Sequence, residues 1–341
     1  MRKRFLTKPI IASGGRQLTY LRLSVTDLCN LRCRYCMPPQ GVAKLRHEDV
    51  LTYEEMLRLA RIGAGLGLTK LRLTGGEPLV RRGLLDFIRR LKDDIGFNDL
   101  RLTTNGLLLP DMAAELKRSG LAGLNISLDA LEPDIYAQMS GLSADKGRAA
   151  AAQAWRGFEA ALEHGFSTKI NCVPICGAND SQIVPLARLA IKYPVDVRFI
   201  EHMPVGSGQL WDQQRFVPSQ ELMENLSREL GPLTPLPAVD SSAPARRFTF
   251  PGSKGALGFI SAMSRHFCGA CNRLRLTVDG RLKPCLLTGR EIDLRGPMRN
   301  GLGDEKLAEL FHLAASEKPA CHQEVFHSLT GTGREMNRIG G

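Results

Sequence analysis

Residues 21–36 read LRLSVTDLCNLRCRYC, an apolar run that leads directly into three closely spaced cysteines. A short run rich in Leu and Val predicts a β-strand over residues 21–26. Cys29, Cys33 and Cys36 follow in the loop that leaves this strand, with the spacing CxxxCxxC. Three thiolates at this spacing can converge on one inorganic centre without help from a distant part of the chain.

Further runs of this kind recur as far as about residue 205. The predicted strands are residues 21–26, 70–74, 100–104, 124–128, 169–174 and 196–200. The predicted helices between them are residues 53–66, 84–95, 111–118, 148–164 and 182–192. This alternation indicates repeated βα units around a parallel sheet, in the α/β class. Six units are too few for a closed eight-stranded barrel, so we expect either an incomplete barrel or an open doubly wound sheet.

Polar groups and glycines follow these strands at the point where each ends. They are Cys29, residues 75–77 (GGE), Asn105, Asp129, and His202 with Met203. In both candidate folds the chemistry lies at the carboxyl ends of the strands. We therefore expect a functional site at this edge, where the glycines would let backbone approach a ligand closely.

The character of the chain changes after residue 230. Pro232, Pro235, Pro237 and Pro244 indicate a linker, which short strands over 247–250 and 257–261 and a helix over 305–315 follow. We therefore predict two domains, residues 1–230 and 231–341. The Gly-rich end, residues 330–341, is interpreted as mobile.

The first cysteine triplet favours iron and sulfur over zinc. Structural zinc normally has four protein ligands, and His47 is the nearest candidate for a fourth. A four-iron cluster held by three cysteines leaves one iron open to a small ligand. Iron–sulfur centres of this kind support radical chemistry with S-adenosylmethionine.

The second triplet, Cys268, Cys271 and Cys285, leaves two interpretations open. With His266 it could form a Cys₃His zinc site, and alternatively it could hold a second three-cysteine cluster. Arg273 and Arg275 alternate along the segment between these cysteines, so an extended chain would place both guanidiniums on one face, suited to phosphate oxygens. The remaining cysteines, Cys172, Cys176 and Cys321, show no ligand pattern.

Charge and composition limit the classes of partner and the cellular location that we expect for this chain. The 341 residues include 46 Lys and Arg against 35 Asp and Glu, a net charge of +11 that favours an anionic partner such as nucleic acid, a phosphorylated small molecule or an acidic surface. No apolar run is long enough to span a bilayer, and residues 1–9 lack the apolar stretch of a secretory signal. We therefore expect a cytoplasmic location, where cysteine triplets indicate metal chemistry before disulfides. The chain has no Walker A motif and no GxGxxG, so common nucleotide-binding folds are disfavoured.

Three motifs together carry a resemblance to a known family: CxxxCxYC at residues 29–36, TGGEP at 74–78, and CxxCNRLR at 268–275 with Cys285. The chain resembles the molybdenum cofactor biosynthesis protein A family of GTP 3',8-cyclases, within the radical S-adenosylmethionine (SAM) superfamily. The resemblance extends from Gly15 and Arg16 to the terminal Gly340 and Gly341. It implies an incomplete (βα)6 TIM-type barrel, with a C-terminal cluster-binding region that covers the open side.

The resemblance also implies roles for individual residues. Two [4Fe-4S] clusters are expected, one on Cys29, Cys33 and Cys36 that cleaves SAM, and one on Cys268, Cys271 and Cys285 that meets the guanine of GTP. The residues expected to bind SAM are Tyr35, Gly76, Ser127 and Met203. Those expected to bind GTP are Arg22, Arg72, Thr103, Lys169, Arg273 and Arg275. The terminal Gly-Gly is expected to reach toward the active site.

The implied reaction converts GTP to 3',8-cyclo-7,8-dihydro-GTP through a 5'-deoxyadenosyl radical, as the first step of molybdenum cofactor biosynthesis. Its expected partners are a reducing electron donor and a downstream cyclic pyranopterin monophosphate synthase, with a homodimer as one candidate assembly and no nucleic-acid or membrane partner. One alternative is another radical SAM enzyme with an auxiliary cluster, for example one that modifies a peptide. Another is a zinc-binding nucleic-acid module, although the basic residues form no single dense stripe.

Overall fold

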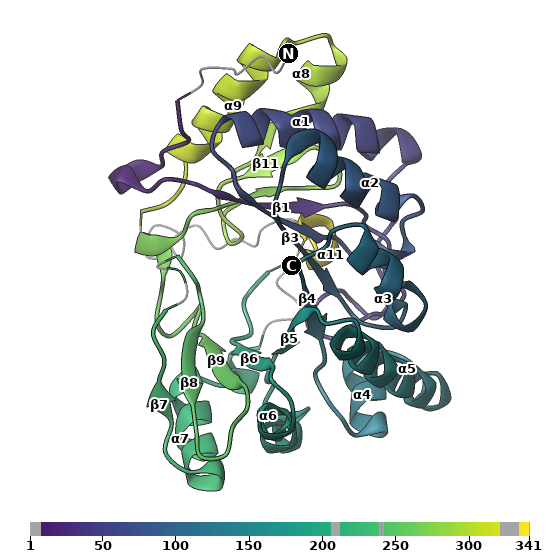
Figure 1. The fold of residues 1–341 in the computed structure, drawn as a ribbon, viewed down its shortest axis with the longest axis vertical. Helices are drawn as coiled ribbons and strands as arrows, with labels where there is room; N and C mark the ends of the chain where they lie inside the picture. The colour runs from purple at the N-terminus through teal and green to yellow at the C-terminus, as the bar shows by residue number, and fades with distance from the viewer. Residues whose placement is uncertain (1–7, 206–211, 239, 241, 321–333, 341) are drawn as a thin grey trace.

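Six parallel strands, each hydrogen-bonded to the next in chain order, form the centre of the protein (Figure 1). The computed structural model describes residues 8–205, 212–238, 240, 242–320 and 334–340. The six central strands are β1 (Tyr20–Ser24), β2 (Lys70–Thr74), β3 (Asp99–Thr104), β4 (Gly123–Ser127), β5 (Ser167–Cys172) and β6 (Asp196–Ile200). This consecutive order is that of a partial (βα)6 barrel, so the predicted fold class is confirmed and the doubly wound alternative is wrong.

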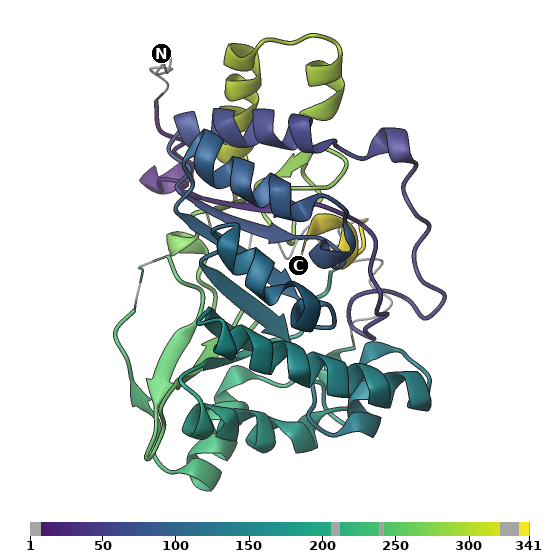
Figure 2. The ribbon, with the colours of Figure 1, turned by 45° about the vertical axis from the view of Figure 1, so that its right-hand side comes forward.

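Helices cover the outer side of these strands, as Figure 2 shows. They are α1 (Tyr53–Gly65), α2 (Leu84–Arg90), α3 (Leu109–Arg118), α4 (Pro133–Ser140), α5 (Ala144–Glu163) and α6 (Ile183–Lys192). Alternate strand residues such as Leu71 and Leu73 are fully buried against them, while Arg72 between these leucines points to the inner side. The period-two alternation thus divides each strand into an apolar outer face and a polar inner face.

The predicted boundaries of the helices and strands match the structure except where the chain bends or where the hydrophobic pattern is weak. The predicted helix over 84–95 is α2 followed by a π-helical turn, Leu91–Ile95, which ends at the left-handed Gly96. Helix α4 was not predicted, nor was α7 (Ser219–Leu230). Both begin beside a proline, Pro133 and Pro218, which suits the start of a helix.

The C-terminal region extends the central sheet at both edges. Its strands are β7 (Thr234–Pro235), β8 (Arg246–Thr249), β9 (Ala256–Ile260), β10 (Arg273–Leu276), β11 (Arg281–Lys283) and β12 (Ile292–Asp293). Strand β9 pairs with β6, and β10 pairs with β1, both in parallel. The predicted domain boundary at residue 230 coincides with the end of α7. The predicted linker is only partly irregular, because β7 lies within it at the edge of the sheet, where proline is tolerated.

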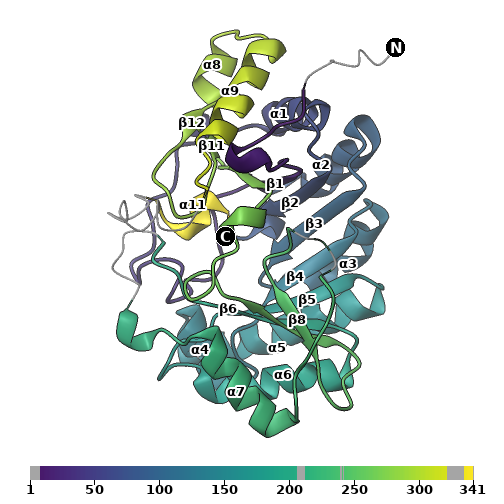
Figure 3. The ribbon, with the colours of Figure 1, turned by 90° about the vertical axis from the view of Figure 1, so that its left-hand side faces the viewer.

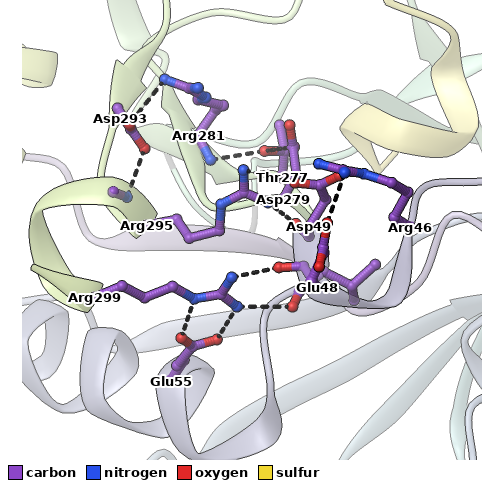
Figure 4. A network of polar contacts seen from close by, with 12 residues as sticks. Arg46, Glu48, Asp49, Glu55, Thr277, Asp279, Arg281, Asp293, Arg295 and Arg299 are labelled. Carbon is purple, nitrogen blue, oxygen red and sulfur yellow. Dashed lines mark hydrogen bonds and ion pairs between the residues drawn. The ribbon is translucent and has the colours of Figure 1, made fainter.

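Two further helices, α8 (Arg295–Arg299) and α9 (Asp304–Ser316), dock on the first βα unit. Arg299 Nε contacts Glu55 Oε1 at 2.6 Å, and Arg295 Nη2 contacts Asp49 Oδ1 at 3.2 Å (Figure 4). Such partly exposed ion pairs contribute little free energy individually. They nevertheless fix where this region sits against α1.

The end of the chain turns back to the inner side of the strands. Residues Met336–Ile339 form helix α11, which Figures 1 and 3 place inside the arc of the sheet. Ile339 is fully buried against Val205 and Leu287. The interpretation of this end as mobile is therefore wrong for residues 334–340, because apolar burial fixes them. Residues 330–333 and Gly341 lie outside the described residues.

Within the described ranges, every helix is too short or too polar to cross a lipid bilayer.

Candidate active site

A cavity of about 690 Å³ occupies the inner side of the barrel. Every residue that the sequence analysis assigned to a cluster, to SAM or to GTP lines it, whereas Asp129, also expected at the strand ends, does not. These are Arg22, Cys29, Cys33, Tyr35, Cys36, Arg72, Gly76, Thr103, Ser127, Lys169, Met203, Cys268, Cys271, Arg273, Arg275 and Cys285. The fold thus brings the two triplets and the predicted basic residues together around one space.

The first triplet lies in the loop after β1. Cys29, Cys33 and Cys36 are half-buried free thiols. Burial, together with weaker effects of neighbouring groups, raises the pKa of Cys29 to about 11 and that of Cys36 to about 12, because desolvation disfavours the thiolate. A bound metal centre reverses this preference, since coordination deprotonates a thiol. Three buried sulfurs that need a positive centre to ionise fit an iron–sulfur cluster.

The glycine turn after β2 packs on this loop. The backbone N–H of Gly76 donates to Thr26 O, and that of Glu77 donates to Leu28 O, both at 2.8 Å. A Cβ atom at Gly76 would lie 2.3 Å from Leu28 O. Gly76 therefore lets the turn approach the backbone of the cysteine loop, in addition to lining the cavity.

Two buried carboxylates connect the strand ends. Tyr35 donates to Asp129 Oδ2 at 2.8 Å, and Asp129 Oδ1 accepts from the backbone of Val173 at 2.8 Å. Glu77 accepts from the backbone N–H of Asn105 at 2.7 Å. Desolvation raises the pKa of Asp129 to about 6 and that of Glu77 to about 7, although these hydrogen bonds partly offset the effect. Asp129 thus joins the cysteine loop to the ends of β4 and β5, and Glu77 joins the glycine turn to the end of β3.

Several polar atoms beside the cavity have no partner among the described residues. They include Asn125 Oδ1, Asn171 Oδ1 and His202 Nδ1, all of them buried. Each of these residues lines the cavity near the carboxyl ends of the strands. Because an unpaired buried polar atom is costly, such atoms indicate a polar ligand in this part of the cavity.

A row of cations crosses the inner face of the sheet. The strand register aligns Arg22 with Arg275 on one side and with Arg72 on the other, and Arg72 with Arg101. In the described residues, ten Lys and Arg side chains and four Asp and Glu side chains line the cavity. Such an excess of buried positive charge favours a polyanion such as a triphosphate.

The pKa values of two of these cations show that burying positive charges side by side disfavours their charged forms. Burial, and then the neighbouring guanidiniums of Arg198 and Arg101, lower the pKa of Lys169 to about 7. Burial and Arg273 lower the pKa of Arg275 to about 10. A bound anion would stabilise the charged form of both groups.

The second triplet, which the C-terminal region supplies, also lines the cavity. Burial opposes ionisation of Cys271, but the charges of Arg273 and Lys318 outweigh burial and lower its pKa to about 6. Arg16 donates to Cys268 O at 2.6 Å. The sequence analysis missed Lys318 because nothing in the local sequence distinguishes it from a surface lysine after a helix.

The zinc interpretation of this triplet has no geometric support. It requires three thiolates and His266 around a single ion. Among the described residues, no three His, Cys, Asp or Glu side chains lie close enough together to hold one metal ion. His266 Nδ1 instead lies 3.1 Å from Ala262 O.

The end of α11 reaches the basic row and the loop that follows β1. Arg275 Nη1 donates to Gly340 O at 2.6 Å, and Asn337 Nδ2 donates to Asp27 O at 2.8 Å. Gly340 has φ +77°, and a Cβ atom there would lie 2.1 Å from Thr74 Oγ1. Only glycine fits this position without displacement of its neighbours.

A partial (βα)6 barrel with a CxxxCxxC loop after its first strand defines the class of radical SAM enzymes. In agreement, residues 23–190 match the Radical SAM superfamily, and residues 195–324 match the Molybdenum Cofactor Synthesis C family. The GTP 3',8-cyclase of Pelotomaculum thermopropionicum is 46% identical over 329 residues, which cover 96% of this chain and 98% of that protein. The GTP 3',8-cyclase of Heliobacterium modesticaldum is 44% identical over 333 residues, 97% of this chain and 100% of that protein. The chain belongs to the GTP 3',8-cyclase family.

The fold has relatives among solved structures. SuiB of Streptococcus suis gives a TM-score of 0.58 at 13% identity, over 93% of this chain and 76% of that chain. SuiB bound to S-adenosylmethionine gives a TM-score of 0.55 at 13% identity, over 93% of this chain and 74% of that chain. At this identity the likeness shows the fold alone. The family assignment shows a radical SAM enzyme that uses SAM and a [4Fe-4S] cluster, and the nucleic-acid alternative is therefore wrong.

Proposed function

We propose that this chain converts GTP to 3',8-cyclo-7,8-dihydro-GTP, the first step of molybdenum cofactor biosynthesis, with each part of the reaction at a distinct wall of the cavity. The observation that carries the proposal is the placement of both cysteine triplets and the row of arginines around one enclosed space. Membership of the GTP 3',8-cyclase family supports the choice of substrate.

In this proposal Cys29, Cys33 and Cys36 hold the [4Fe-4S] cluster that binds SAM. When bound and reduced there, this pair would supply the radical chemistry that removes a hydrogen atom from C3' of the GTP ribose. Tyr35, Gly76, Ser127 and Met203 line the cavity on this side and are assigned to SAM. The unpaired atoms of Asn125 and Asn171 offer further polar contacts.

GTP is assigned to the basic side of the cavity. Its triphosphate would lie across Arg22, Arg72 and Lys169, with Arg273 and Arg275 beside it. Thr103, a residue of β3, is also assigned to GTP. Arginine suits this role because its planar fork bonds two phosphate oxygens at once. The aligned strand register supports the assignment, because it places Arg275, Arg22 and Arg72 in one row.

The second [4Fe-4S] cluster is assigned to Cys268, Cys271 and Cys285, where it would bind the guanine of GTP. The tendency of Cys271 toward the thiolate supports a metal at this wall. The C-terminal region, residues 231–341, is proposed as the domain that closes the open side of the barrel, where Gly340 lies against Thr74. We further propose a reducing electron donor and a cyclic pyranopterin monophosphate synthase that takes the product, with a homodimer as a candidate assembly.

The test is an anaerobic assay. Reconstituted protein is reduced with dithionite and incubated with SAM and each of GTP, ATP, CTP and UTP. We expect 3',8-cyclo-7,8-dihydro-GTP and one 5'-deoxyadenosine per product from GTP alone. Formation of 5'-deoxyadenosine with GTP left unchanged would contradict the proposal, and would favour another radical SAM activity such as peptide modification.

A further inference from the structure

Lys318 lies two residues beyond the end of α9, and its side chain is buried beside the second triplet, with 4% of the residue exposed. Its Nζ donates to Arg273 O at 2.8 Å and to Pro284 O at 2.7 Å. The side chains of Cys271 and Cys285 lie close enough for their charges to act on this ammonium group. An ammonium group has three donors, and the two carbonyl oxygens accept from two of them.

These contacts join the two segments that carry the triplet. Arg273 begins β10, two residues after Cys271, and Pro284 precedes Cys285 directly. Both segments lie at the open end of the antiparallel hairpin of β10 and β11, in which Arg275 pairs with Lys283. Lys318 thus fixes the spacing of Cys271 and Cys285 beyond the last paired residues of the hairpin.

The backbone around Lys318 is itself held by the N-terminal segment. Ser13 Oγ donates to Lys318 O at 2.9 Å, and Arg16 Nη2 donates to Pro319 O at 2.8 Å. The same guanidinium donates through Nη1 to Cys268 O. The ammonium therefore has a rigid support, which also contacts the third member of the triplet.

The charge of Lys318 needs a counterpart. A buried lysine is rare unless it is paired, because desolvation of an ammonium is costly. Two carbonyl dipoles do not neutralise it, and the nearby guanidinium of Arg273 repels it. Negative charge beside it comes from Cys271 and Cys285 when they are metal-bound thiolates.

We propose that Lys318 is a positioning residue for the second cluster, which holds the Cys271 and Cys285 segments together and keeps a positive charge beside these ligands. The inference rests on the proposed function. Hydrogen bonds to cluster sulfurs and local charge both set a cluster's reduction potential. Without the ammonium, the reduced and more negative state loses stabilisation, so the midpoint potential becomes more negative.

The experiment compares the full-length parent with three variants. Lys318→Met removes the charge and the donors but keeps an unbranched chain, and Lys318→Arg keeps the charge. Arg58→Met is the matched control, because Arg58 anchors the same helix α9 through Asp304 Oδ1 and Leu302 O, each at 2.7 Å. Iron and sulfide per chain are measured first. The midpoint potential and the electron paramagnetic resonance spectrum of the second cluster follow, with its signal assigned in a Cys29→Ala, Cys33→Ala, Cys36→Ala background.

We expect Lys318→Met to shift the potential of the second cluster to more negative values and to alter its spectrum. Lys318→Arg should stay closer to the parent, Arg58→Met should match it, and SAM cleavage at the first cluster should persist in all three. An unchanged potential and spectrum in Lys318→Met would overturn the inference. Lys318→Met could also lose the iron of the second cluster altogether. In that case, retention of this iron in Lys318→Arg supports the role of the charge. Equal loss of iron in both variants, or an equal shift of the midpoint potential in both, overturns the inference. A parent with iron at the first triplet alone would instead contradict the proposed function, and this inference with it.

Discussion

Arg275 Nη1 donates a hydrogen bond to the carbonyl oxygen of Gly340 at 2.6 Å, and this contact joins the basic row of the cavity to the end of the chain. Arg275 is 8% exposed and lies between Arg22 and the second triplet. A single guanidinium is thus placed to contact both the C-terminal segment and a phosphate oxygen.

Loss of either β10 arginine should weaken GTP binding. Each hydrogen bond to a charged group contributes about 1.5–3 kcal/mol, so Arg273→Ala or Arg275→Ala should raise the Kd for GTP about tenfold to a hundredfold. SAM cleavage without GTP should change little. Isothermal titration calorimetry under argon measures the binding. Arg148→Ala on the exposed side of α5 removes the same charge and serves as the control. Equal GTP affinity in all four proteins would refute the phosphate role.

Gly340→Ala should impair cyclisation more than binding. The new Cβ atom would collide with Thr74 Oγ1 in addition to straining a left-handed backbone, so the end of the chain must move. Gly301→Ala is the matched control, since Gly301 has φ +85° with nothing within 4 Å. We expect a drop in turnover of at least tenfold for Gly340→Ala alone, by product assay at saturating GTP. Deletion of Gly340 and Gly341 should act the same way. Unchanged turnover in these proteins would make this end dispensable.

GTP binding should depend on pH through Lys169, whose pKa is lowered to about 7. A bound triphosphate favours the charged ammonium and raises this pKa, so binding takes up a proton above pH 7. Affinity should therefore fall as the pH rises from 7 toward 9, by at most tenfold per pH unit for one proton. Calorimetry in two buffers of different ionisation enthalpy measures the uptake. Lys169→Arg should abolish it, because a guanidinium stays charged in this range. Equal proton uptake in this variant would assign the proton to another group.

Replacement of the first triplet and replacement of the second should have different effects on SAM cleavage. Replacement of Cys29, Cys33 and Cys36 by Ala should remove about four irons and all cleavage of SAM. Replacement of Cys268, Cys271 and Cys285 should remove a similar amount of iron but leave cleavage of SAM in the absence of GTP. Cys176→Ala, at an exposed cysteine, is the control. Iron and sulfide analysis with a 5'-deoxyadenosine assay decides the matter. Full iron content after loss of the second triplet would contradict a second cluster.

Local features of the chain were sufficient to predict its six central strands. The strands over residues 70–74 and 196–200 lie where their runs of apolar residues predicted, because period-two alternation directly reports which strand face is buried. Arg273 and Arg275 both line the cavity for the same reason. The roles of the individual site residues stay predictions, although the fold brings all of them to one cavity.

Contacts between distant segments decided the rest. Lys318 reaches Arg273 from 45 positions away, and Arg275 reaches Gly340 across 65. No periodicity encodes such pairs, so the terminal segment was interpreted as mobile although burial of Ile339 fixes it. The sequence by itself determined the βα order, the inward face of each strand and the cysteine spacing, because these depend on neighbouring residues. Tertiary structure alone decided that Lys318 is buried beside the second triplet and that Gly340 contacts Arg275, because burial and charge act through space between segments far apart in the chain.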